Sequence, residues 1–136
     1  MKYLLDTNVC IRYLNGQSKN IRQTLDRSSF GQTALCSVVR TELLYGALKS
    51  AQPERNMERL LHFFKGFPCL PFDERASDAY AGIRLQLEAI GRPVGPNDLL
   101  IAATALAHEL TLVTHNTKEF GRIEGLAMED WETPAA

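Results

Sequence analysis

The sequence YLLDTN at residues 3–8 joins a short apolar strand to an acidic residue, and a helical pattern begins directly after it. This junction places the carboxylate of Asp6 at the carboxyl end of a predicted first strand. Open α/β sheets form their ligand sites at that edge. An Asp in this position also commonly caps the following helix, so Asp6 alone leaves both interpretations open.

Strands and helices alternate along the rest of the chain. We expect strands at residues 2–6, 33–37, 69–72 and 111–114, and an edge strand at 126–128, which makes four or five in total. Helices are expected at residues 8–15, 18–28, 38–50, from 53 onward, 73–90 and 96–108. Strands separated by helices predict an α/β fold with a mainly parallel sheet that is covered on both faces.

The composition indicates an ordinary globular chain. Its 136 residues fit one domain, residues 1–136, and the apolar share of 45% and charged share of 23% are typical of such folds. No apolar run approaches the roughly 20 residues of a membrane helix, and an acid comes too early for a secretory signal. We therefore expect a cytoplasmic protein. The net charge of −1 argues against bulk electrostatic binding of nucleic acid but permits a local basic rim.

The cysteines and histidines lack the spacing of metal ligands. An odd number of widely separated cysteines argues against a disulfide framework or a zinc site. We expect all three to be small buried hydrophobes: Cys10, Cys36 and Cys69. We expect the histidines at the surface or at the rim of a site: His62, His108 and His115.

Two further acids stand near the starts of later helices. On a helical wheel Glu42 falls beside Gly46, on a helix that otherwise reads as largely buried, so its charge needs a partner or a metal. The alternative is a solvent-facing Glu on a narrow polar strip with Lys49. Asp98 lies in a first helical turn on the same side as Ile101 and other small apolar residues. It could instead simply complement the helix dipole.

Three carboxylates in these positions suggest a site for a divalent cation. Two carboxylates about 5 Å apart repel by roughly 3 kcal/mol at an effective dielectric constant near 20, and a bound cation would offset that cost. Oxygen ligands favour Mg²⁺ or Mn²⁺ over zinc or copper. Protein-bound Mg²⁺ typically acts on phosphates, so metal-assisted phosphodiester hydrolysis by in-line attack of water is the predicted chemistry.

The segment VTHNTKEF at residues 113–120 begins where a predicted strand ends. Thr114, Asn116 or Glu119 could therefore reach the same crevice. Residues of these types are also common in simple turns, and residue type alone does not assign them a function.

These segments together resemble one family. LLDTN (4–8), SVVRTEL (37–43), GRPVGPNDLLIA (91–102), THNTKEF (114–120) and LAMEDW (126–131) are similar to the sequence motifs of PIN-domain ribonucleases. More narrowly, they resemble the VapC-type toxins of bacterial type II toxin–antitoxin pairs. The matching segments are short, but they span almost the whole chain in the family's order.

The resemblance implies an α/β/α sandwich and a Mg²⁺-dependent endoribonuclease in which Mn²⁺ can substitute. Asp6 and Asp98 would be direct metal ligands, and Glu42 would reach the ion or its water. The family commonly has a fourth acid after the last central strand. This chain has Asn116 at one candidate position and Glu119 three residues later, and both stay open as catalytic candidates.

Supporting residues and partners follow from the same resemblance. Thr7 and Thr114 would orient ligands or water. The form GRPVGPND is similar to members that cleave initiator tRNA in the anticodon region, so tRNA is the expected RNA substrate. A cognate antitoxin is expected across the crevice. A homodimer is expected as well, with the apolar surfaces at residues 43–48 and 60–64 available either for that contact or for the core.

An acidic crevice needs basic residues beside it to hold RNA. We expect two or three contacts from a set of six candidates: Arg12, Lys49, Arg55, Arg92, Lys118 and Arg122. Tyr13 and Tyr45 could stack on unpaired bases, although core positions are the more frequent use of such residues.

Two other functions compete with the nuclease. A Mg²⁺-dependent phosphatase would want a second Asp two residues after the first, where this chain has Asn8. A catalytically inert RNA- or protein-binding module would use its acids only as helix caps, and it would show no stabilisation by Mg²⁺.

Overall fold

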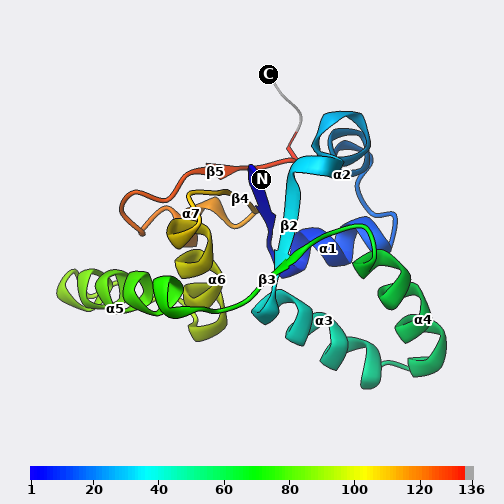
Figure 1. Cartoon of the computed structure of the whole chain (residues 1–136), viewed down its shortest axis with the longest axis horizontal. Coiled ribbons are helices and arrows are strands. Elements are labelled where there is room, and N and C mark those ends of the chain that lie inside the picture. The colour runs from blue at the N-terminus through cyan, green and yellow to red at the C-terminus, as the bar shows by residue number, and fades with distance from the viewer. Residues whose placement is uncertain (134–136) are drawn as a thin grey trace.

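A parallel five-stranded sheet lies at the centre of the computed structural model, which describes residues 1–133 (Figure 1). Its strands are β1 (Tyr3–Leu5), β2 (Thr33–Cys36), β3 (Cys69–Leu70), β4 (Thr111–Val113) and β5 (Met128–Glu129). Their spatial order is β3-β2-β1-β4-β5, and each neighbouring pair is parallel. The prediction of a mainly parallel sheet is confirmed, with the edge strand at the C-terminal end as its fifth member.

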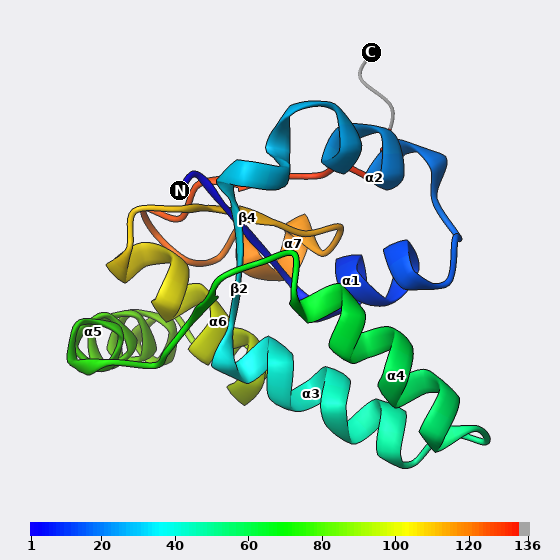
Figure 2. The same cartoon turned by 45° about the vertical axis from the view of Figure 1, so that its right-hand side comes forward.

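Helices cover both faces of this sheet. They are α1 (Thr7–Leu14), α2 (Lys19–Thr24), α3 (Ser37–Leu48), α4 (Pro53–Phe64), α5 (Glu74–Ala89), α6 (Pro96–Ala107) and α7 (Thr117–Phe120). Figures 1 and 2 show α1 to α4 on one side of the sheet and α5 to α7 on the other. The predicted α/β/α sandwich is therefore present. Within residues 1–133, none of the helices is both long and apolar enough to cross a membrane.

The central strands and α6 form the core. All four residues of β2 are buried, and Leu4 and Leu5 of β1 are completely buried, as expected for parallel strands covered on both faces. In α6, every residue from 101 to 105 is buried, and three of the five are alanines. Small side chains allow this helix to pack closely against its neighbours.

Two local predictions differ from the structure. The helix expected to reach residue 28 is α-helical only to Thr24, then widens into a π-helical turn (Leu25–Ser29). A short 3₁₀ segment (Phe30–Gln32) then leads directly into β2. The segment after β4 was expected as a turn, but residues 117–120 form the single helical turn α7.

The prediction that the helix carrying Glu42 is largely buried is wrong. Only Val39, Leu43 and Ala47 of α3 are buried, because one side of this helix packs inward while the other faces outward. Tyr45 and Leu48 are 63% and 64% exposed, so Tyr45 is not a core residue. The surface at residues 43–48 is thus partly free for contact with another chain.

The apolar surface predicted at residues 60–64 lies mainly in the core. Of the three cysteines, two are buried and one is exposed. Leu60 and Phe64 of α4 are buried, so residues 60–64 serve mainly the core. Cys10 and Cys36 are buried as expected, and burial raises the pKa of the Cys36 thiol to about 11. Cys69 is exposed, contrary to the prediction, because β3 is a two-residue strand at the edge of the sheet.

Replacing Ile101 with Ala is expected to lower the free energy of unfolding by about 2–5 kcal/mol, because a fully buried side chain leaves a cavity. Urea unfolding followed by circular dichroism measures this loss. Leu85→Ala on the exposed side of α5 is the matched control and should change stability by no more than about 0.5 kcal/mol. Equal losses in both variants would contradict the central role of α6.

Candidate active site

Four carboxylates gather at one edge of the sheet. Asp6 follows β1 directly, Glu42 lies in the second turn of α3 after β2, and Glu119 lies in α7 after β4. Asp98 comes from the first turn of α6. Because parallel strands end at the same edge, these segments meet there, and Asp98 interacts electrostatically with each of the other three acids.

Asp6 caps a helix and also lies within the cluster of acids. Its Oδ1 accepts a hydrogen bond of 2.8 Å from the backbone N–H of Val9, which caps α1. The exposed fraction of Asp6 is only 5%, and this burial raises its pKa, although the neighbouring Thr114 hydroxyl and the Val9 N–H both act to lower it.

Glu42 is fixed by two donors. The Thr7 hydroxyl donates to Oε1 at 2.5 Å, and the Asn97 side-chain amide donates to Oε2 at 3.3 Å. The alternative of a solvent-facing Glu that shares a polar strip with Lys49 is therefore wrong. The role of Asn97 was not predicted, although its position directly before Asp98 is the signal that could have revealed it.

The surroundings of Asp98 disfavour the charged form of its carboxyl group. Burial, followed by the charges of Glu119, Asp6 and Glu42, raises the pKa of Asp98 to about 6. The predicted alternative, an acid that merely complements the helix dipole, does not account for this environment. Asp98 is half-buried and faces three like charges, an arrangement that favours a bound cation.

Glu119 is the acid that contacts Asp98. The backbone N–H of Gly95 donates to its Oε1 at 3.0 Å, and this bond lowers the pKa of Glu119. The Asn116 side-chain amide donates to its Oε2, also at 3.0 Å. Asp98 and Glu119 interact closely, and their pKa values shift in opposite directions: that of Asp98 is raised and that of Glu119 is lowered. Asn116 is therefore a hydrogen-bond partner of Glu119.

The donor set fits a hard divalent cation. Every ligand candidate at this edge is an oxygen, which suits Mg²⁺ or Mn²⁺ rather than zinc or copper. Among the residues that the structure describes, no three His, Cys, Asp or Glu side chains stand as a ready metal cage. Mg²⁺ does not need one, since it commonly uses one or two carboxylates and keeps several waters. Burial of Asp6 and the crowding around Asp98 are the observations that favour such an ion.

A cavity of about 540 Å³ opens beside the carboxylates. Asp6 and Asn116 line one part of it, while Arg12, His115 and Glu132 line another. It lies between α1, the loop that follows β4 and the segment that follows β5. A phosphodiester near Asp6 would therefore have room for a neighbouring nucleotide.

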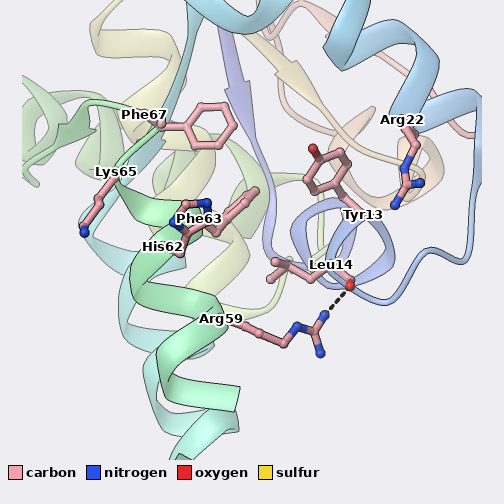
Figure 3. A pocket seen from close by; sticks show the side chains of 9 residues that line it. Tyr13, Leu14, Arg22, Arg59, His62, Phe63, Lys65 and Phe67 are labelled. Atoms are coloured by element: carbon pink, nitrogen blue, oxygen red, sulfur yellow. Dashed lines mark hydrogen bonds between the residues drawn. The ribbon is translucent and has the colours of Figure 1, made fainter. Parts of the chain in front are cut away.

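A second cavity, of about 530 Å³, lies between α1, α2 and α4 (Figure 3). Tyr13, with Phe63 and Phe67, gives it an aromatic wall, and four basic side chains lie around it: Arg22, Arg59, His62 and Lys65. Arg59 donates to the carbonyl oxygen of Leu14. No Asp or Glu is among the described residues that line it, so it suits an anionic or apolar group and not a metal cation.

The candidate basic rim divides into several groups. Arg12 lines the cavity beside Asp6, and its Nε lies 2.7 Å from Oε1 of Glu132. Lys49 lies about 10 Å along the α3 axis from Glu42 and places its ammonium 4.9 Å from the Tyr45 ring centre, so geometry does not support it as a rim residue.

The remaining candidates are exposed or support neighbouring loops. Arg122 donates to the Pro93 carbonyl oxygen at 2.9 Å, and Arg55 donates to the side chain of Gln52, the residue before α4. Arg92 and Lys118 are exposed in segments that flank Asp98 and Glu119, and they stay predictions as RNA contacts. Tyr13 packs partly against the core, as expected.

Known proteins match this chain over almost its full length. Residues 3–126 match the PIN domain family. A Shigella flexneri protein named tRNA(fMet)-specific endonuclease VapC is 40% identical over 131 residues, which cover 96% of this chain and 98% of that protein. Ribonuclease VapC2 of Rickettsia felis is 38% identical over 133 residues, covering 97% and 99%.

Solved structures agree with the sequence relatives. A crystal structure of DNA-bound VapBC from Salmonella typhimurium has a chain that matches with a TM-score of 0.92 at 37% identity, covering 96% of this chain and 98% of that one. A VapBC2 complex from Rickettsia felis, bound to a DNA fragment of its promoter, matches with a TM-score of 0.90 at 37% identity, covering 96% and 99%. This chain belongs to the PIN-domain family and, within it, to the VapC ribonucleases.

Proposed function

We propose that this protein is the toxin of a toxin–antitoxin pair and hydrolyses RNA phosphodiester bonds with Mg²⁺ as its cofactor. The observation that supports this most directly is the meeting of Asp6, Glu42, Asp98 and Glu119 at one edge of the sheet, with the pKa of Asp98 raised to about 6. PIN-domain VapC nucleases are metal-dependent, and the oxygen donors of this chain favour Mg²⁺, with Mn²⁺ as a substitute.

Each acid has a proposed part in holding the ion. Asp6 and Asp98 are direct ligands, Glu42 reaches the ion or its water, and Glu119 is the fourth acid. A bound Mg²⁺ would polarise a phosphoryl oxygen and make an attacking water more acidic. The two buried or half-buried aspartates would position that ion within the rigid edge formed by β1 and α6.

The hydrogen-bond partners of the acids act as positioning residues. Thr7 and Asn97 fix the two oxygens of Glu42, and the backbone N–H of Val9 fixes Asp6, with Thr114 nearby. Asn116 fixes Glu119. These donors keep the carboxylates oriented while leaving them charged, which is the state that a metal ligand needs.

The proposed substrate is tRNA, cut in the anticodon region of an initiator tRNA. Support comes from the Shigella flexneri relative, whose name states specificity for tRNA(fMet), and from the similar segment GRPVGPND at residues 91–98. Arg92 in this segment and Lys118 near Glu119 are exposed and could neutralise phosphates of such a substrate. The cytoplasm, where tRNA resides, is the proposed location.

A cognate antitoxin and a second copy of the chain are the proposed protein partners. The Salmonella typhimurium and Rickettsia felis structures are complexes of VapBC, and we expect an antitoxin to cover the crevice here as well. Tyr45 and Leu48 on α3 are exposed apolar side chains suited to a homodimer contact.

The competing functions explain less of the geometry. In an inert binding module, Asp6 would need only its capping bond to Val9, and the crowding of Asp98 against Glu119 would have no use. In a phosphatase, the position two residues after Asp6 would carry a second acid, but Asn8 stands there.

Asp6→Asn and Asp98→Asn are each expected to reduce RNA cleavage at least 100-fold, because each removes a charge from the proposed ion site. Purified protein is incubated with total cellular RNA and Mg²⁺, and new RNA ends are mapped by sequencing. EDTA should stop cleavage. Asp78→Asn on the exposed face of α5 is the charge-matched control and should cleave normally. Normal cleavage by either site variant removes that residue from the mechanism.

Mg²⁺ is expected to raise the melting temperature of the wild-type protein by about 3–6 °C at ten times its dissociation constant. Asp98→Asn should show little of this rise, because the ion loses a ligand. Thermal unfolding with Mg²⁺, Mn²⁺ or EDTA measures the effect. An unchanged melting temperature of the wild type in both metals would favour the inert binding module.

In EDTA at pH 7, the Asp98→Asn variant is expected to be more stable than wild type. Its free energy of unfolding should be about 1–2 kcal/mol higher, a value that allows for partial screening of Asp98 by solvent. The raised pKa means that folded Asp98 binds its proton first as pH falls, so protonation stabilises the wild type increasingly between pH 6 and 4. The advantage of the variant should therefore disappear near pH 4. Urea unfolding across this range measures the difference.

Asp78→Asn serves again as the control and should change the free energy of unfolding by no more than about 0.5 kcal/mol at any of these pH values. An Asp98→Asn variant no more stable than wild type at pH 7 would show that Asp98 is not held at an electrostatic cost.

A further inference from the structure

The cavity beside Asp6 contains polar groups that the proposed hydrolysis does not use. Its volume of about 540 Å³ lies within the range of small-ligand sites. Asp6 and Asn116 belong to the carboxylate cluster, while Asn8, Gln17 and His115 on the other parts of its wall do not. These three side chains come from the start of α1, the loop after α1 and the loop after β4.

Two of these side chains are carboxamides with unused hydrogen-bonding capacity. Asn8 and Gln17 are both exposed, and neither side chain bonds to another part of residues 1–133. Gln17 is nevertheless held in place, because its backbone N–H donates to the Arg12 carbonyl oxygen at 2.9 Å. A carboxamide offers a donor and an acceptor side by side, as base recognition requires.

His115 adds a third group with a fixed orientation. Its Nδ1 lies 3.0 Å from Oδ2 of Asp130, which favours the tautomer with the proton on Nδ1. Asp130 is itself held by the backbone N–H of Glu132 at 2.9 Å and by the hydroxyl of Thr133 at 2.8 Å. In the part of the chain that the structure describes, Nε2 has no partner and can accept a hydrogen bond from a ligand.

The charge and the apolar surface of this cavity suit a base better than a phosphate. The ion pair between Arg12 and Glu132 leaves little net positive charge to attract a phosphate group. Ile11, which is 39% exposed, contributes an aliphatic surface to the same cavity. A planar heterocycle could lie against Ile11 and present its edge to the polar groups.

We propose that this cavity binds the unpaired base of the nucleotide next to the scissile phosphate, and that Gln17 and His115 thereby set the base preference of cleavage. The proposal rests on the ribonuclease function proposed above. Asp6 lines both the cavity and the carboxylate cluster, so a base bound here lies one nucleotide from the bond that is cut. Single-stranded RNA is commonly recognised through bases turned out into such sites.

The test uses the full chain and a library of short single-stranded RNAs with random bases on both sides of one cleavage site. Sequencing of the products gives relative kcat/KM values for each base at each position. Wild type should prefer one base at a position adjacent to the cut. Gln17→Ala and His115→Ala should each reduce this preference about tenfold, the value of one well-placed base contact. Gln23→Ala, an exposed residue of α2 outside the cavity, is the matched control and should keep the preference.

An unchanged base preference in both Gln17→Ala and His115→Ala overturns the proposal. Loss of antitoxin affinity in these variants, with base preference unchanged, would assign the cavity to the protein partner instead. A wild type that cleaves no RNA refutes the proposed function separately. In that case, library RNAs that bind the wild-type protein in EDTA are selected and sequenced, which tests the base-binding cavity without cleavage. If no base is enriched among the bound RNAs, the base-binding proposal is refuted.

Discussion

Mutual repulsion among carboxylates at the carboxyl edge of the parallel sheet is the constraint on which the rest of this structure depends. Like charges held this close favour separation or protonation, and burial together with the charges of Glu119, Asp6 and Glu42 raises the pKa of Asp98 to about 6. The fold opposes separation by placing Asp6 directly after the completely buried Leu4 and Leu5 of β1, and Asp98 at the start of the largely buried helix α6. Packing therefore offsets the electrostatic cost of the site.

The second constraint is the connection between α7 and the loop before α6. Glu119 accepts from the backbone of Gly95, and Arg122 donates to the backbone of Pro93. Gln86 of α5 also donates to the carbonyl oxygen of Arg122 at 3.1 Å. These bonds join segments that are far apart in sequence, and they set the position of Glu119 relative to Asp98. The fourth acid is thus located by loop packing and not by its own strand.

Chemistry and substrate recognition have different physical requirements, and they occupy adjacent parts of one crevice. The carboxylates concentrate negative charge for a hard cation, whereas the neighbouring cavity is nearly neutral and rich in groups that can both donate and accept hydrogen bonds. The aromatic and basic cavity of Figure 3 is separate from both. A cation, a base and an anionic or apolar group would each find a different environment at these three places.

The sequence by itself determined the alternation of strands and helices, the parallel sheet and the three acids Asp6, Glu42 and Asp98, because these depend on local periodicity and on position at element ends. It did not determine the exposed side of α3, the exposure of Cys69 or the π-helical turn after α2, which depend on neighbours distant in sequence. Only the tertiary structure decided which of Asn116 and Glu119 interacts with Asp98: the Glu119 carboxylate does, and Asn116 donates to that carboxylate. That choice depends on hydrogen bonds from Gly95 and Asn116, and such contacts across loops leave no periodic signal in the chain.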